Sequence, residues 1–282
     1  MKTHVLAIII VASLCAVGQC ESVEARLERT VDLPSIVMDG HEAHIHTQGL
    51  VMDDSHVYVT GRLEQKPKRP LLIRFLRAAP KRYQVLDLSH IAKSTGRDDL
   101  DHPGGFSADE HGYVIPIARS RPTGPTLIVR VRRDAKAPFS KWQQELLWQV
   151  DDHIGAIAYA PMSKSYWGAN WDTRQIYTWS GSGRELNRLN RDQFLPSNDA
   201  CVLAVQDWKF ATAAPFGASG TERLIASGLD KSPQRSADTP PSVIDAITLP
   251  ERRLAWRLRL PNQDGVRMAN EGMCLDGESI VL

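Results

Sequence analysis

The sequence predicts an all-β fold, a β-propeller that most simply has five blades, and three observations support this prediction. The body of the chain consists of short strand-sized runs separated by turn residues. No long segment shows the 3.6-residue period of an amphipathic helix. A polar residue followed by a strand-like run recurs at His46, His102, His153, Asp207 and Glu271, which gives steps of 56, 51, 54 and 64 residues. A four-stranded sheet repeated radially is the unit of a propeller.

The first repeat illustrates how each unit is built. The runs "HTQGLVM", "VYVT", "LLIRFL" and "YQVLDL" are four strand-sized segments, and runs of this kind often alternate apolar and polar residues. Turn residues separate them, as in "DD" at Asp53, "DEHG" at Asp109, "SGSG" at Ser180 and "LDGES" at Leu275. Five such units fit the chain, six blades are also compatible with it, and a β-sandwich with coincidental spacing is the alternative fold.

The two ends of the chain are expected to close the ring. The segment "ARLERTVDLPS" near Ala25 resembles the outermost strand of a blade but precedes the first inner strand. The final repeat, "NEGMCLDGESIVL", lacks its outer strands and ends abruptly, so its blade is short or the chain is incomplete. An N-terminal outer strand is therefore expected to complete the last blade, since closure removes exposed sheet edges.

The N-terminus has the pattern of a secretory signal peptide. "MKTHVLAIIIVASLCAVGQC" has a cationic start at Lys2, an apolar stretch from Val5 to Val17, and small residues at Ala16 and Gly18. The stretch is too short for a good membrane span, although an uncleaved anchor is the alternative. We therefore expect a signal peptide over residues 1–18, a single propeller domain over residues 19–282, and a secreted or extracytoplasmic protein with no membrane segment in its mature form.

The net charge limits the expected classes of binding partner, and the cysteine content limits the possible disulfide bonds. The chain carries 34 Lys and Arg against 33 Asp and Glu, a formal net charge of +1, so neither nucleic acid nor an anionic membrane is an expected partner. A monomer is expected. Outside the N-terminal segment only Cys201 and Cys274 occur, and they are compatible either with one disulfide bond or with two separate buried thiols.

The recurring polar positions are expected to meet at one mouth of the central channel. The innermost strand of each blade lines the channel, so the first residues of successive inner strands converge although they are far apart in sequence. The ring would hold His46, His102, His153, Asp207 and Glu271, with Gln48, Trp208 and Asn270 beside them and Asp101 and Asp152 preceding two of the histidines. Glycines such as Gly49 and Gly104 would allow inner strands to approach closely.

This ring is compatible with two kinds of chemistry and with a purely structural role. His46, His102 and His153 are the ligand type that zinc, copper, nickel or iron prefers, so one divalent metal ion is the cofactor that the ring would hold. Asp207 or Glu271 would act as a general base, and Gln48, Trp208 and Asn270 would contact a small-molecule ligand. A metal-free ligand site is equally compatible, and so is a purely structural polar ring that binds backbone groups and water.

Several of these motifs carry a resemblance. "HTQGLVMDDSHVYVT", "HPGGF", "DHIGA" with the following "YTW", and "QDWK" resemble an uncharacterised family of propeller proteins over residues 41–282. "TQGL" and "GANWDTRQIYTWSGSGRE" are distantly similar to glutamine cyclotransferase, a five-bladed propeller, but "VTGRLE" and "PIARSR" stand where that family has acidic motifs. The "NEG" motif resembles gluconolactonase-like metal-dependent hydrolases.

These resemblances imply two functional classes. The first is a propeller that binds a small ligand or a metal, with lactonase-like hydrolase activity as an option and a cyclase as a distant third. The second is a non-enzymatic binding scaffold. A shared fold does not transfer function, so both classes stay open at this point.

Overall fold

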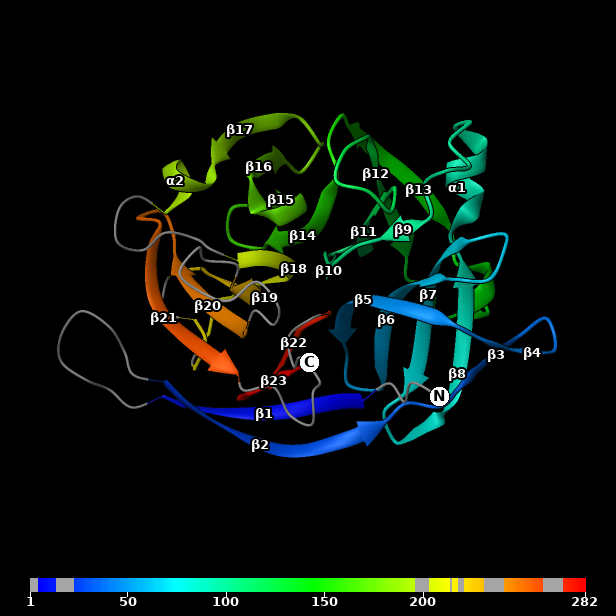
Figure 1. Ribbon diagram of the computed structural model, residues 1–282, viewed down its shortest axis with the longest axis horizontal. Helices are drawn as coiled ribbons and strands as arrows, with labels where there is room; N and C mark the ends of the chain where they lie inside the picture. Colours follow the sequence, from blue (N-terminus) through cyan, green and yellow to red (C-terminus); the bar gives the residue numbers. More distant parts are fainter. Residues whose placement is uncertain are drawn as a thin grey trace.

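Sheets of antiparallel strands arranged around a common centre make up the chain (Figure 1). The structure, a computed structural model, describes residues 5–13, 23–195, 203–213, 215–217, 221–230, 241–260 and 271–282. Four successive sheets form blades of a propeller-like arrangement, and the first strands of these sheets lie nearest the centre. The predicted all-β, propeller-like fold is confirmed.

Each of the four blades orders its strands as they occur in the chain. The first contains β5 (Ile45–Met52), β6 (His56–Leu63), β7 (Arg69–Leu76) and β8 (Ala79–Asp87). The second contains β10 (Ser107–Ala108), β11 (Gly112–Ala118), β12 (Thr126–Arg132) and β13 (Gln144–Val150), with β9 (His102–Pro103) paired to β11. The third contains β14 (Ile154–Ala160), β15 (Ser165–Asn170), β16 (Gln175–Ser180) and β17 (Glu185–Asn190). The fourth contains β18 (Leu203–Ala211), β19 (Arg223–Asp230), β20 (Ser242–Thr248) and β21 (Arg253–Leu260).

A further sheet joins the two ends of the chain. Its order is β2 (Val23–Asp32), β1 (Val5–Ser13), β23 (Ser279–Val281) and β22 (Cys274–Asp276). The strand expected around Ala25 is β2, and it lies at the edge of this sheet. Between β2 and β23 lies β1, which comes from the segment that the sequence predicts to be a signal peptide. Closure therefore uses two N-terminal strands in this structure, where the sequence predicted one.

Apolar side chains of neighbouring blades pack against one another. Between the first and second blades, Tyr58 and Tyr113 lie with ring centroids 4.5 Å apart, and Trp142 stacks on Tyr113 at 6.3 Å. All three are buried, and they belong to one core cluster with Leu72 and Phe139. Burying an aliphatic or Phe-sized side chain of this kind contributes about 1.5–3 kcal/mol, so interfaces between blades supply much of the stability.

Asp207 lies at the centre, where the inner strands meet. Its side chain is fully buried, and one oxygen, Oδ2, accepts hydrogen bonds from Leu50 N at 3.1 Å and Met273 N at 3.0 Å. Its other oxygen, Oδ1, accepts from Trp208 N at 2.9 Å. Leu50 belongs to β5 and Met273 immediately precedes β22, so this one carboxylate ties β18 to two other sheets.

Lys209 completes this central connection. Its ammonium group lies 2.5 Å from Asp207 Oδ1 and donates to Phe106 O in the second blade at 2.7 Å. Space at the centre is tight, because a Cβ atom added at Gly105 would lie 2.7 Å from Asp207 Oδ1, and one added at Gly104 would lie 2.2 Å from Gly155 O. The predicted close approach of inner strands at glycine is thus observed. It leaves little space between these strands at the level of Asp207.

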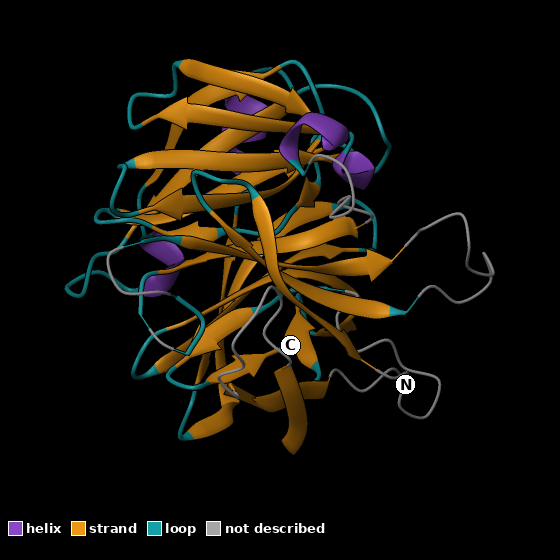
Figure 2. Cartoon of the chain, turned by 90° about the vertical axis from the view of Figure 1, so that its left-hand side faces the viewer, coloured by secondary structure: helices purple, strands orange, loops and turns teal. Residues whose placement is uncertain are grey.

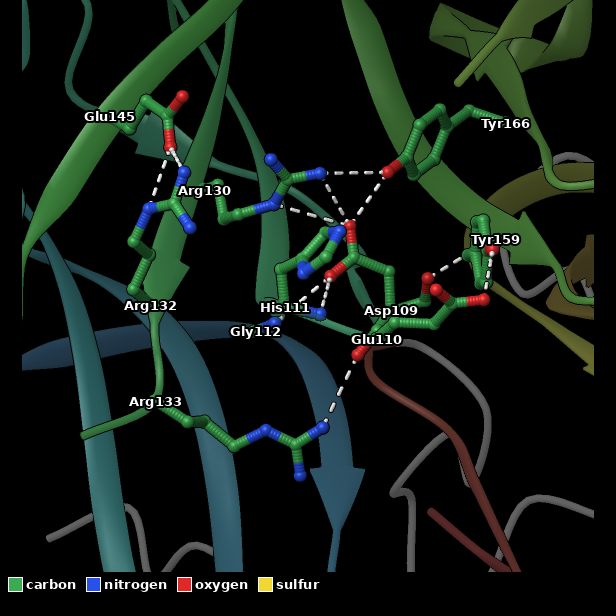
Figure 3. Close-up of polar contacts among 11 residues, drawn as sticks. Asp109, Glu110, His111, Gly112, Arg130, Arg132, Arg133, Glu145, Tyr159 and Tyr166 are labelled. Atoms are coloured by element: carbon green, nitrogen blue, oxygen red, sulfur yellow. Dashed lines mark hydrogen bonds and ion pairs between the residues drawn. The ribbon is translucent and has the colours of Figure 1, made fainter. Parts of the chain in front are cut away.

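A second polar network lies at the other end of the inner strands (Figure 3). Asp109, in the turn that leads into β11, accepts at Oδ2 from Tyr166 Oη at 2.6 Å and from Arg130 Nη2 at 2.7 Å. Its Oδ1 accepts from the backbone of His111 and Gly112 at 2.8 and 2.9 Å. All polar atoms that meet here are satisfied by protein, so this network joins the second and third blades.

Helices are short and lie in the connections (Figure 2). They are α1 (Ser89–Ser94), α2 (Arg191–Phe194) and the 3-10 turns η1 (Phe139–Lys141) and η2 (Trp171–Thr173), while β3 (Ile36–Met38) and β4 (His41–Ala43) form a separate hairpin. Across the described ranges, no helix has the length and apolarity needed to cross a membrane. Cys274 is a buried free thiol, and Cys201 lies outside the described residues.

Candidate functional site

Three imidazole rings from three blades come together at the starts of the inner strands. His46 is the second residue of β5, His102 begins β9, and His153 immediately precedes β14. The ring centroids of His46 and His102 are 5.8 Å apart, and those of His102 and His153 are 6.1 Å apart. The convergence expected from the repeat spacing is therefore observed. We call these three residues, together with Arg62, Glu64, Asp101 and Glu271, the mouth cluster.

His46 lies between two carboxylates and is the most accessible of the three histidines. Its side chain is 43% exposed, with Nδ1 3.8 Å from Glu64 Oε1 and Nε2 3.6 Å from Glu271 Oε1. Glu271 Oε2 accepts a hydrogen bond from the buried Gln48 amide at 2.9 Å. Glu271 precedes β22 and Glu64 follows β6, so carboxylates from two different sheets flank this imidazole.

Arg62 is the buried cation of the cluster. Its Nη2 lies 2.5 Å from Glu64 Oε1, its Nη1 lies 3.3 Å from His102 Nδ1, and the same Nη1 lies 4.0 Å from Asp101 Oδ1. A guanidinium group can only donate, so His102 Nδ1 accepts and the ring proton is on Nε2. Arg62 thereby fixes one tautomer of His102, with an N–H donor at Nε2.

Burial and charge perturb the pKa values of the cluster. Burial lowers the pKa of His102 to about 3, and the nearby charge of Arg62 acts in the same direction. Burial lowers the pKa of His153 to about 4, against the opposing effect of backbone carbonyls at Arg121 and Arg119. Both imidazoles are therefore neutral at physiological pH.

The carboxyl groups are shifted in opposite directions. Burial raises the pKa of Asp101 although Arg62 opposes it. Burial also acts to raise the pKa of Glu64, but hydrogen bonding to Arg62 and its charge outweigh burial, and the net pKa is lowered. Neighbouring groups with oppositely perturbed pKa values are characteristic of functional sites.

Two buried polar atoms of the cluster have no hydrogen-bond partner among the described residues. They are Asp101 Oδ1 and His153 Nδ1. A buried polar atom left without a partner costs about 1–3 kcal/mol, and in most native structures such groups are satisfied. The mouth cluster thus differs from the Asp109 network, in which each buried oxygen of the carboxylate is bonded.

Comparison with known proteins provides a family. A model described as a family of unknown function, DUF6454, matches residues 87–269, which is more than half of the chain. The chain belongs to the DUF6454 family. The matched range contains Asp101, His102 and His153, whereas His46 and Glu271 lie outside it. No curated protein matches this DUF6454 chain.

Solved structures resemble the DUF6454 protein in fold. One solved structure is described by the statement that the GH130 family of mannoside phosphorylases contains glycoside hydrolases that target β-1,2 mannosidic linkages in Candida mannan. It has a TM-score of 0.50 and 12% sequence identity to this chain, and the match covers 83% of this chain and 78% of that one. A chain of a nidogen/laminin complex has a TM-score of 0.46 at 14% identity, over 95% and 97% of the two chains. An auxiliary nutrient binding protein from Bacteroides thetaiotaomicron has a TM-score of 0.43 at 9% identity, over 99% and 76%.

At such low identity, the GH130 match shows the fold alone, and the other two carry no argument. The distant similarity to glutamine cyclotransferase and to gluconolactonase-like hydrolases that the motifs suggested is not shown by these comparisons.

The geometry of the DUF6454 protein disfavours the predicted metal site. A metal bound at His102 Nε2 would require the ring proton on Nδ1, where it would face the N–H of Arg62 at 3.3 Å. The positive charge of Arg62 would also repel a divalent cation. Within the described part of the chain, no group of three or more His, Cys, Asp or Glu side chains is arranged to hold a metal ion. The sequence could not reveal this, because Arg62 comes from a different strand.

Asp207 and Trp208 lie below the mouth and not in it. Asp207 is the fifth residue of β18, and it bonds to Leu50, four residues beyond His46 on β5, which is roughly 13 Å along an extended strand. Trp208 is fully buried and stacks on Phe194 at 6.2 Å, within the core between the third and fourth blades. The repeat spacing placed these residues too near the mouth. The bulge at Gln206 in β18 corresponds to the bulges at Gln48–Gly49 in β5 and at Gly155 in β14, so the residue of β18 that matches His46 lies before Asp207.

The remaining predicted residues are placed as follows. Asn270 lies outside the described residues. Asp152, which directly precedes His153 in the sequence, accepts from the backbone N of His153 at 2.7 Å and from Tyr177 Oη at 2.7 Å. It therefore shapes the loop and does not contact the ring.

Sequence reasoning missed Arg62, Glu64 and Trp171. His46 pairs with Arg62 across β5 and β6, so the end of each second strand returns to the mouth where the first strand began. Trp171, directly after β15, lies edge-on to His153 with ring centroids 4.8 Å apart. The hairpin pattern was readable from the sequence, and pairing the start of each first strand with the end of each second strand would have found these residues.

Proposed function

We propose that this DUF6454 protein binds a small, uncharged, hydroxyl-bearing molecule at the mouth cluster. One observation carries the proposal: three imidazoles from separate blades converge at the mouth, and two buried polar atoms there, Asp101 Oδ1 and His153 Nδ1, have no hydrogen-bond partner among the described residues. In the Asp109 network, by contrast, both carboxylate oxygens are bonded within the protein.

The charges of the cluster favour an uncharged ligand. Arg62 pairs with Glu64 at 2.5 Å, Lys68 pairs with Glu64 at 3.4 Å, and Asp101 lies 4.0 Å from Arg62. The imidazoles of His102 and His153 are neutral. An anion would face these carboxylates and a divalent cation would face Arg62, whereas hydroxyl groups both donate and accept and leave the existing pairs intact.

We assign roles to the cluster on this basis. Glu271 and Glu64, whose side chains are 31% and 33% exposed, accept from ligand hydroxyl groups. His102 donates from Nε2 and Arg62 holds it in that tautomer. Gln48 positions Glu271, and Trp171 provides an apolar face at the edge of the cluster. Asn270, next to Glu271 in sequence, stays a proposed ligand contact.

Saturation-transfer NMR tests the proposal. The probes are a panel of neutral hexoses and pentoses, each offered beside its amino sugar and its uronic acid, so that matched probes differ mainly in charge. We expect a neutral sugar to bind the wild type and the control His111→Ala, an exposed histidine at the other end of the inner strands, but not His102→Ala. Binding that survives in His102→Ala, or no binding by any member of the panel, refutes the proposal.

Hydrolysis at the same site is a second candidate. The raised pKa of Asp101 favours it, since a carboxyl group that holds its proton at higher pH can act as a general acid. Glu271 is then the general base and Asp101 the acid. Turnover of δ-gluconolactone by the wild type that is lost in both Glu271→Gln and Asp101→Asn, but kept in the control His111→Ala, would support hydrolysis. Absence of turnover in the wild type would leave binding as the only function.

We further propose five blades and a secreted protein. The sheet β2–β1–β23–β22 supports a fifth blade, because a Cβ atom at Gly272 would lie 2.5 Å from the backbone of Gly49 and because Met273 bonds to Asp207. The cationic start and apolar stretch of residues 1–18 support secretion. Both proposals concern β1. The sheet proposed as the fifth blade contains β1, whereas removal of residues 1–18 would leave β2 without the strand with which it pairs.

A further inference from the structure

A hollow of about 280 Å³ lies on the first blade, away from the mouth cluster. It is formed where β6 starts, where β7 ends and along the neighbouring part of β8, which is the end of the blade opposite to His46. Its lining residues are His56, Arg74, Leu76, Arg82, Tyr83 and Gln84. The set contains two guanidinium groups and no carboxylate.

Arg74 is held in place but lacks an opposite charge. Of the arginines in and directly after β7, Arg69 pairs with Asp87 at 3.2 Å and Arg77 pairs with Asp276 at 2.6 Å. Arg74 has no carboxylate within ion-pair distance among the described residues. Its Nε instead donates to Gln84 Oε1 at 3.0 Å, and its guanidinium lies over the ring of Phe139 at 4.5 Å. Stacking and hydrogen bonding fix the direction of this group without neutralising its charge.

The other polar groups of the hollow are compatible with a negative ligand. Arg82 is exposed on β8 and, like Arg74, forms no ion pair with any described carboxylate. His56 lies 3.7 Å from Asp53, yet burial and then the charge of Arg74 lower its pKa. Burial and the charge of Arg74 together lower the pKa of His56 although Asp53 opposes them, so the charge of Arg74 acts on His56.

We propose that this hollow binds an oxyanion of the phosphate or sulfate type. Guanidinium groups present N–H donors in a planar fork that matches such oxygens, and charge-assisted bonds of this kind are about twice as strong as neutral ones. Arg74 supplies a guanidinium group held by Gln84 and Phe139, Arg82 an exposed guanidinium group, and neutral His56 one further donor. The anion is either free in solution or carried on a larger molecule such as a sulfated glycan.

Calorimetric titration of the full chain with sodium phosphate, sodium sulfate and a sulfated heparin oligosaccharide, against sodium chloride of equal ionic strength, tests this proposal. The variants are Arg82→Gln and Arg82→Glu, which change an exposed side chain and so leave folding intact. The matched control is Arg188→Gln, an exposed arginine on β17 that pairs with Glu185 at 2.8 Å. We expect the Kd for the oxyanion to rise about tenfold in Arg82→Gln and further in Arg82→Glu, but not in the control.

The outcomes separate the source of the anion from the proposal itself. Binding of phosphate or sulfate alone indicates a free anion, and binding of the oligosaccharide alone indicates a sulfated glycan. Either result supports the site if Arg82→Glu abolishes it. No heat beyond that of sodium chloride, or equal binding by Arg82→Glu and the wild type, overturns the proposal and leaves Arg74 as a purely structural cation on Phe139.

Discussion

Replacing Asp207 by Asn removes one negative charge from the centre of the propeller with almost no change in shape. In the wild type, Oδ1 contacts the Lys209 ammonium at 2.5 Å and Oδ2 accepts from Leu50 N and Met273 N. The variant leaves Lys209 buried without its carboxylate, and the new NH₂ group faces an N–H or N⁺–H donor on whichever side it lies.

The magnitude follows from this geometry. Breaking a buried ion pair by removing one partner costs about 3–5 kcal/mol. A domain of this kind has a total free energy of unfolding of about 5–15 kcal/mol, so the loss is a large fraction of it. Because the bonded groups lie on four sheets, the variant loosens the attachment of blades to one another rather than a single strand.

Urea unfolding followed by tryptophan fluorescence measures this loss. We expect Asp207→Asn to lower the free energy of unfolding by about 3–5 kcal/mol, and Asp207→Asn with Lys209→Met to recover part of it, because the double variant leaves no unpaired buried charge. Glu185→Gln, which breaks the exposed pair with Arg188, is the control and is expected to cost less than about 1 kcal/mol. A loss within about 1 kcal/mol in Asp207→Asn would show that the central carboxylate does not connect the sheets as described.

Three further predictions concern the mouth and the N-terminus. The pKa values of His102 and His153 in the folded protein, about 3 and about 4, lie below their value of 6.5 in the unfolded chain. Between the folded and unfolded pKa values the unfolded chain binds more protons, so stability is lost as the pH falls below about 6.5. Each histidine changes the free energy of unfolding by up to about 1.4 kcal/mol per pH unit. His102→Gln should remove one such contribution from the pH dependence of the free energy measured by urea unfolding between pH 6 and 4. An unchanged pH dependence contradicts the assignment of His102 as neutral. Imidazole ¹⁵N shifts at pH 7 should show the Nε2–H tautomer for His102, and Arg62→Met should allow both tautomers to form; a pure Nδ1–H form in the wild type contradicts the role of Arg62. Intact mass of the exported protein should correspond to a chain that starts near residue 19, whereas a mass that retains residues 5–13 would show that β1 belongs to the mature sheet.

The sequence by itself determined the class of fold and the position of three histidines. Strands with alternating polarity and turn residues between them lead to hairpins whatever the surroundings, because these signals act within a few residues. Once hairpins repeat every fifty-odd residues, the starts of the inner strands must lie at one end of the propeller. That is why the sequence alone predicts that His46, His102 and His153 meet.

Only the tertiary structure decided which residues surround them. Asp207 lies roughly four residues deeper than its position in the repeat implies, because β18 meets β5 with Asp207 beside Leu50 and not beside His46, and register is set by the packing and pairing of strands in the fold. Arg62 arrives from the second strand of the first blade and reaches His102 in the second blade, a contact between residues that no spacing rule connects. It is this contact that fixes the tautomer of His102 and disfavours a metal ion at its Nε2.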